Sequence, residues 1–70
     1  MIAPNFETLL TSIRQMRDRI RAMSVTDATM LHSGVAAEAA RLCERAGVTD
    51  SSVQRFAADI FDEAVRRHLR

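Results

Sequence analysis

The side chains best suited to bind a metal or to act as nucleophiles are few and widely separated in this sequence. They are one cysteine, Cys43, and two histidines, His32 and His68. Their separations match no recognised zinc-site spacing. Neighbouring carboxylates such as Asp62 and Glu63 would diverge by about 100° around a helix, which does not suit paired acid–base catalysis. We therefore expect no metal site, no cofactor and no catalytic activity.

Cys43 has two possible roles. Arg41 and Arg45 lie two residues away on either side, and positive charge of this kind activates a thiol. The cysteine also falls beside Ala39 and Leu42 on the apolar side of the same segment, which favours a small buried hydrophobic residue. A single cysteine cannot form a disulfide within the chain and is typical of a reducing compartment. We expect Cys43 to be a buried, structural thiol.

Arginine supplies the main charge feature of the sequence. All ten basic residues are arginine, as is common in GC-rich bacterial or phage genomes, while the formal net charge is only +1. Arg14, Arg17 and Arg21 are spaced by three and four residues, so they share one face of a helix. The aliphatic parts of these arginine side chains can shield an apolar seam, or their guanidinium groups can bind an acidic protein partner or contact phosphates. We take these three arginines as candidate partner-binding residues.

The first segment that must position these arginines is a predicted helix over about residues 5–23. Pro4 and Asn5 are typical of a helix start. Apolar residues then recur with alternating spacings of three and four, which is the pattern of a heptad seam. The seam consists of Phe6, Leu9, Ile13, Met16, Ile20 and Met23.

Two further helices are predicted over about residues 27–46 and 51–69. Each follows residues whose oxygens commonly cap helix starts. Gly34 is a weak point inside the second helix, where either a continuous helix or a break is possible. Gly47, followed by Val48, fits the left-handed residue that ends many helices. The fold class is therefore all-α, with three amphipathic helices in one domain over residues 1–70.

The third helix has an apolar arc of roughly 200°, wider than a surface helix normally needs. A chain of 70 residues removes only about 60% of its surface from water on folding, so its core needs a supplement. Leu10 and Met30 lie off the main stripes, and with Phe61 and Val65 they predict an exposed apolar patch. We expect self-association to complete the bundle, with the arginine face pairing with acids such as Asp59 or Asp62 across a twofold axis.

The joint around Gly47 allows a second interpretation. Residues 46–55, Ala-Gly-Val-Thr-Asp-Ser-Ser-Val-Gln-Arg, resemble the turn and second helix of repressor-type helix-turn-helix units. Cys43, Val48 and Val53 stand where that family has its small and apolar packing residues. The resemblance, over about residues 40–58, implies contacts with DNA through Ser51, Ser52, Gln54 and Arg55. An ordinary helix end followed by a helix cap would give the same residues.

Two functions remain as expectations from the sequence. The first is a protein–protein interaction module, such as a regulator, adaptor or co-chaperone, that binds itself and another protein. The second is a small DNA-binding regulator. No apolar run is long enough for a membrane span, and the first residues do not resemble a signal peptide, so we expect a cytoplasmic protein without membrane association.

Overall fold

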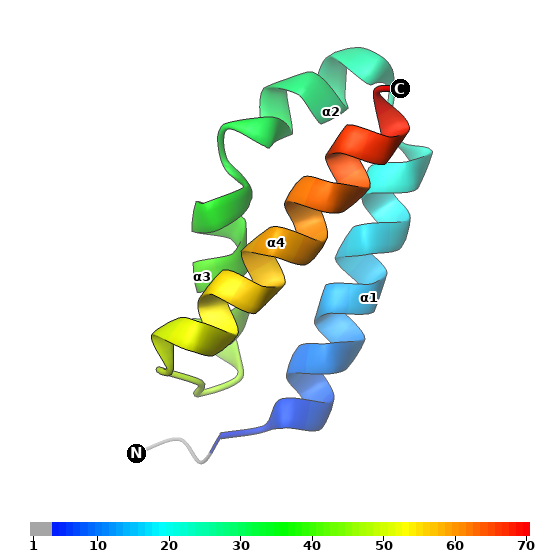
Figure 1. Cartoon of the computed structure of the whole chain (residues 1–70). Coiled ribbons are helices and arrows are strands. Elements are labelled where there is room, and N and C mark those ends of the chain that lie inside the picture. The colour runs from blue at the N-terminus through cyan, green and yellow to red at the C-terminus, as the bar shows by residue number, and fades with distance from the viewer. Residues whose placement is uncertain (1–3) are drawn as a thin grey trace.

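The computed structural model of this chain describes residues 4–70, which form four α-helices and no strand. They are α1 (Phe6–Ala22), α2 (Val25–His32), α3 (Val35–Arg45) and α4 (Ser51–His68) (Figure 1). The all-α class is confirmed. The predicted count of three helices is wrong, because the second predicted helix is divided into α2 and α3.

The start and the seam of α1 follow the sequence pattern. Asn5 is the N-cap, and its side-chain oxygen accepts a hydrogen bond from the Thr8 backbone N–H at 3.0 Å. Most of the predicted seam is buried, while Met23 is half-buried and Phe6 remains 54% exposed. The buried part of the seam consists of Leu9, Ile13, Met16 and Ile20.

The break in the second predicted helix lies at Ser33 and Gly34. The Gly34 backbone N–H donates to the Leu31 carbonyl at 2.7 Å, a tight turn that interrupts the α-helical pattern. Glycine is a poor helix former, so interrupting the helix there costs little. The second predicted helix also starts earlier than the predicted residue 27. The first residue of α2 is Val25, because the Ser24 side chain caps this helix by accepting a hydrogen bond from the Asp27 N–H at 3.1 Å.

The joint between α3 and α4 consists of two complete helix caps. Gly47 has a φ of 71°, and its N–H donates to the Glu44 carbonyl at 3.0 Å. The Val48 N–H donates to the Cys43 carbonyl at 2.8 Å, which completes a Schellman motif. Asp50 then caps α4. The left-handed glycine predicted from the sequence is confirmed.

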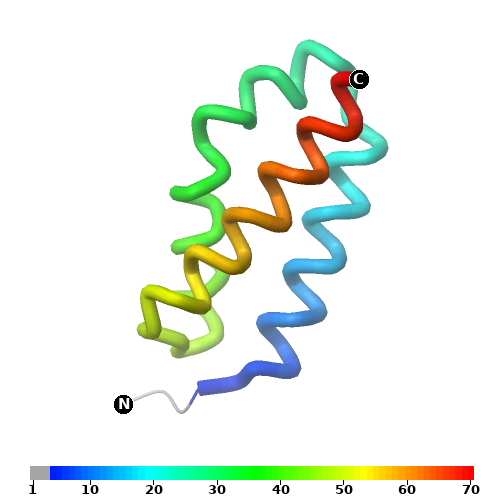
Figure 2. Tube along the Cα trace, in the orientation of Figure 1, coloured from blue at the N-terminus to red at the C-terminus, as the bar shows by residue number. Residues whose placement is uncertain are grey.

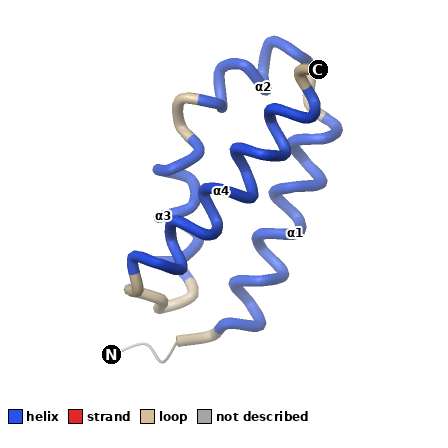
Figure 3. The backbone as a smooth tube through the Cα atoms, in the orientation of Figure 1, coloured by secondary structure: helices blue, strands red, loops and turns tan. Residues whose placement is uncertain are grey.

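The chain runs up α1, crosses one end of the bundle in α2, and returns along α3 before α4 runs back up (Figures 1 and 2). The loops between these helices are short (Figure 3). Parallel α1 and α4 are joined near their C-terminal ends by a hydrogen bond of 2.7 Å between His68 Nε2 and the Met23 carbonyl. At the start of α1, the Asn5 N–H donates to the carbonyl of Ala46, at the end of α3, at 2.8 Å.

The central position of α4 explains its wide apolar arc. It contacts α1, α2 and α3, so a broad surface of this one helix is buried within the monomer. Phe61 and Val65 are buried there. Leu10 lies in the first half of α1, whereas Met30 lies in α2 beyond the other end of that helix, so they do not form one patch. Phe61 and Val65 therefore do not belong to an exposed apolar patch, contrary to the prediction from the sequence.

Candidate functional site

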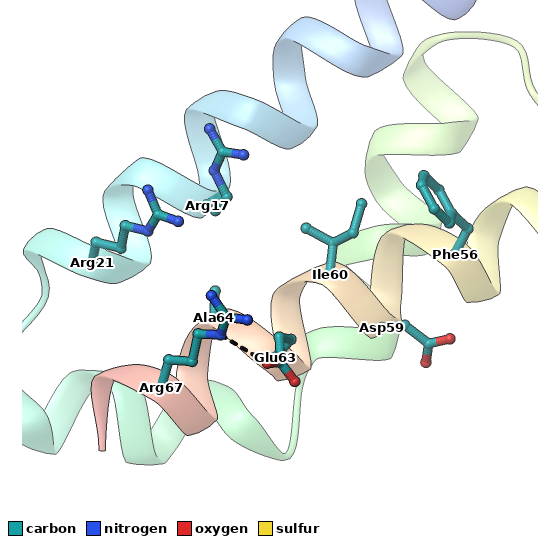
Figure 4. Close-up of a pocket in the computed structure, with 8 residues that line it drawn as sticks. All are labelled: Arg17, Arg21, Phe56, Asp59, Ile60, Glu63, Ala64 and Arg67. Atoms are coloured by element: carbon teal, nitrogen blue, oxygen red, sulfur yellow. Dashed lines mark hydrogen bonds and ion pairs between the residues drawn. The ribbon is translucent and has the colours of Figure 1, made fainter. Parts of the chain in front are cut away.

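An open groove of about 470 Å³ lies between the parallel helices α1 and α4 (Figure 4). Its α1 side is formed by Arg17 and Arg21, and Ile60 points from α4 toward that side. The α4 side consists of Phe56, Asp59, Ile60, Glu63, Ala64 and Arg67. The groove therefore has an apolar floor with charged groups of both signs around it.

Helical spacing explains why these side chains meet. On α1, Arg17 and Arg21 are four residues apart and lie beside the buried seam. On α4, the spacings of four, three and four align the side chains that face α1, and the fully buried residues of α4 lie behind them. This aligned set consists of Phe56, Ile60, Glu63 and Arg67.

Arg17 is the most constrained charged residue of the groove. Its Nε is buried and makes no hydrogen bond within residues 4–70. The nearest carboxylate oxygen, Oδ1 of Asp18, is 3.6 Å from that Nε, and 3.9 Å from Nη1 of Arg21. Both distances exceed those of a good charge-assisted hydrogen bond. The side chains of Arg17 and Arg21 are 39% and 59% exposed, so both guanidinium groups can reach a partner at the groove through their exposed nitrogens.

The carboxylates of α4 differ in how they are paired. Glu63 Oε1 accepts from Arg67 Nε at 2.8 Å along the same helix. Asp59 is exposed, and its carboxylate makes no ion pair or hydrogen bond with any of residues 4–70. One carboxylate at the groove is thus available to a partner.

Exposed apolar side chains continue the groove toward the starts of both helices. Phe56 is 56% exposed at the groove itself. Leu10, 46% exposed, lies seven residues before Arg17, which places it two turns away on the same side of α1. The groove therefore has a basic end and an apolar end.

The structure places the predicted partner-binding residues in different environments. Arg17 and Arg21 line the groove, while Arg14 is exposed on α1 and does not line it. Phe61 and Val65 are 1% and 0% exposed, so they stabilise the core of the monomer and are not accessible to a partner. Asp59, which the sequence suggested as an acid that pairs with the arginine face, lines the groove. Phe56 also lines it, although it was not among the partner-binding residues expected from the sequence.

The residues proposed for DNA contact lie in the first turns of α4. Ser51, Ser52 and Arg55 are exposed, whereas Gln54 is half-buried. The Asp50 carboxylate already accepts a hydrogen bond of 2.8 Å from the Ser52 N–H. Its negative charge occupies the helix N-terminus, where a phosphate would otherwise be favoured.

The remaining reactive side chains have structural surroundings. Cys43 is fully buried, as predicted, and burial raises the pKa of its thiol. His32 Nε2 lies 2.7 Å from Oδ1 of Asp62, whose other carboxylate oxygen forms an ion pair with Arg66 Nε at 2.8 Å. Within residues 4–70, no group of three His, Cys, Asp or Glu side chains is placed to hold a metal ion.

None of the helices in the described part of the chain combines the length and the apolar character needed to cross a membrane. Comparison with known proteins adds no relative of this chain: no family model, no curated protein and no solved structure matches it.

Proposed function

We propose that this chain is a non-catalytic protein–protein interaction module that acts as a regulator, adaptor or co-chaperone. The observation that carries the proposal is the groove between α1 and α4, with its apolar floor, exposed Phe56 and incompletely paired arginines. Aromatic and arginine side chains are the residue types that contribute most to protein interfaces. A partner with apolar and acidic side chains matches this surface.

DNA binding through the start of α4 remains the second candidate. Its support is the exposure of Ser51, Ser52 and Arg55 directly after the turn at Gly47. Against it stands the negative charge of Asp50 and Asp59 near the same surface, which would repel phosphates. We therefore favour the protein interface.

Site-specific photo-crosslinking in living host cells tests the two functions against each other. A photoreactive phenylalanine analogue replaces Phe56 in one variant and Ser52 in another. We expect protein adducts from position 56 and no nucleic-acid adducts from position 52. A third variant with the analogue at exposed Ala37 of α3 measures random collision.

Two results together would overturn the proposal in favour of DNA binding. The first is nucleic-acid adducts from position 52, and the second is a level of protein adducts from position 56 no higher than that from position 37. Salt dependence gives an independent check. Binding to duplex DNA through phosphates weakens steeply as salt increases, while we expect no such binding for this chain.

A further inference from the structure

We propose that the groove between α1 and α4 binds an amphipathic helix of another protein, with carboxylates on the flank of that helix that faces α1. This inference rests on the proposed function and names the chemistry of its partner. The groove has an apolar floor between two rims of different charge (Figure 4). The floor and each rim select a different property of the occupant.

The floor selects the secondary structure and the apolar side of the occupant. Phe56 is 56% exposed, and Ile60, one turn later, is half-buried. Both walls are α-helices, whose backbone N–H and C=O groups already bond within each helix. An extended peptide would leave its backbone groups without partners on this floor, whereas a helix satisfies them internally. The occupant is therefore a helix that turns large apolar side chains toward Phe56 and Ile60.

The α1 rim selects carboxylates. Arg17 and Arg21 are four residues apart, a rise of about 6 Å along the helix. The only carboxylate that pairs with them among residues 4–70 is Asp18, at 3.6 Å from Arg17 and 3.9 Å from Arg21. One carboxylate beside two guanidinium groups leaves this rim with an excess positive charge. Two carboxylates four residues apart on an approaching helix have the same spacing as the arginines, and arginine pairs favourably with carboxylate.

The α4 rim has the opposite excess charge. Glu63 and Arg67 neutralise each other at 2.8 Å, while Asp59 has no ion-pair partner among residues 4–70. A basic side chain on the second flank of the occupant complements Asp59. A nucleic acid would instead bring its phosphates against Asp59 and Glu63. The two rims together match a helix that is acidic on one flank and basic on the other.

The positions of these groups along the groove determine the direction of the occupant. The hydrogen bond between His68 and Met23 joins positions 45 residues apart, and the same offset places Arg21 level with Arg66. Arg21 is therefore about 15 Å beyond Phe56 along α4, at the opposite end of the groove (Figure 4). Acidic side chains are favoured at the start of a helix and basic ones at its end. The occupant therefore begins near Arg21 and ends near Phe56, antiparallel to α1 and α4.

Photo-crosslinking in living host cells, with mapping of the captured peptide, tests this inference. The photoreactive phenylalanine analogue replaces Arg21 in one variant and Phe56 in another, and tandem mass spectrometry identifies the partner residue that each captures. Both variants should capture the same segment of one protein. Position 21 should capture a residue about ten positions before the one captured from position 56. Carboxylates should lie within about four residues of the site captured from position 21.

A charge reversal tests the α1 rim in the variant that carries the analogue at position 56. Arg21→Glu replaces an attraction by a repulsion and should lower the adduct yield about fivefold. Arg21→Lys keeps the charge and should retain most of the yield. Arg19→Glu, at an exposed position of α1 outside the groove, is the matched control and should leave the yield unchanged. Circular dichroism melts report whether each variant folds, and the order of the captured residues does not depend on Arg21→Glu.

Several results would overturn this inference: a captured segment without carboxylates, captured residues in the reverse order, or capture of only a second copy of this chain. An unchanged yield for folded Arg21→Glu would do the same. In each of these cases position 56 still captures protein above the level at position 37, so the proposed function stands. If position 56 captures no protein above that level, both proposals fall.

Discussion

The two glycines of the chain lie at opposite ends of α3, Gly34 at its start and Gly47 after its last turn, but only Gly47 needs to be glycine. Gly47 has a φ of 71°, a conformation that penalises any β-carbon. Gly34 has a φ of −109°, and a β-carbon built there would meet only the Leu31 carbonyl oxygen, at an ordinary 3.6 Å. The same substitution should therefore have different effects at the two positions.

We predict that Gly47→Ala lowers the free energy of unfolding by about 1 to 2 kcal/mol, because alanine is strained in the left-handed conformation. Gly34→Ala serves as the matched control. It should change stability by no more than about 0.5 kcal/mol. Alanine restricts the unfolded chain, so less entropy is lost on folding, and this gain offsets the poorer helix start. Urea unfolding of both variants measures the difference. Equal effects at the two sites would contradict the assigned helix end.

Cys43 should behave as a buried, unreactive thiol. Because burial favours the neutral form, its pKa lies above the ordinary value of 9.0, and the folded chain holds less thiolate at pH 8 than the unfolded chain. We predict that a thiol reagent labels the native chain far more slowly than the chain in denaturant. The raised pKa also predicts that this group's contribution to stability, complete below pH 9, decreases as the pH rises through the raised value.

Native labelling of Cys43 at a rate close to that of the denatured chain would show that the thiol is accessible. Cys43→Ala is the control for reagent binding elsewhere. Cys43→Ser should destabilise the chain by about 1 to 3 kcal/mol, because its hydroxyl would enter an apolar core.

Among the helices, α2 is held least firmly. Ala28 is its only buried residue, and the side chain of His32 connects its last turn to Asp62 of α4. We predict that His32→Ala speeds amide hydrogen exchange across α2 while changing the melting temperature little, since exposed ion pairs contribute only about 0 to 1 kcal/mol. His68→Ala, which removes the contact with Met23 instead, should affect the C-terminal ends of α1 and α4. Unchanged exchange in α2 of the first variant would contradict this role.

The sequence predicted most elements because their signals are local. The seam of α1, the cap at Asn5 and the left-handed Gly47 all depend on residues within a few positions of one another. The break at Gly34 remained open, because a glycine inside a helix weakens it without requiring that it end. The break depends on how α2 and α3 both reach α4, which is a tertiary property.

At the scale of the whole molecule, the candidate site could be predicted only in part. The common face of Arg17 and Arg21 follows from their spacing, but their position opposite Phe56 and Asp59 requires α1 and α4 to be parallel neighbours. That arrangement follows from the path of the chain through α2 and α3. For the same reason the sequence did not predict the burial of Phe61 and Val65, since the spacing of apolar residues on α4 does not show that three helices cover it.

The elongated shape of the monomer, 40 × 18 × 14 Å, leaves long sides apart from the groove against which a second copy can lie, as the self-association expected from the sequence requires. Sedimentation equilibrium from micromolar to submillimolar concentrations tests this central claim most directly. We predict that the mass rises from 7.8 kDa toward twice that value as the concentration increases. A single species of 7.8 kDa at every concentration, with a melting temperature independent of concentration, would contradict the dimer.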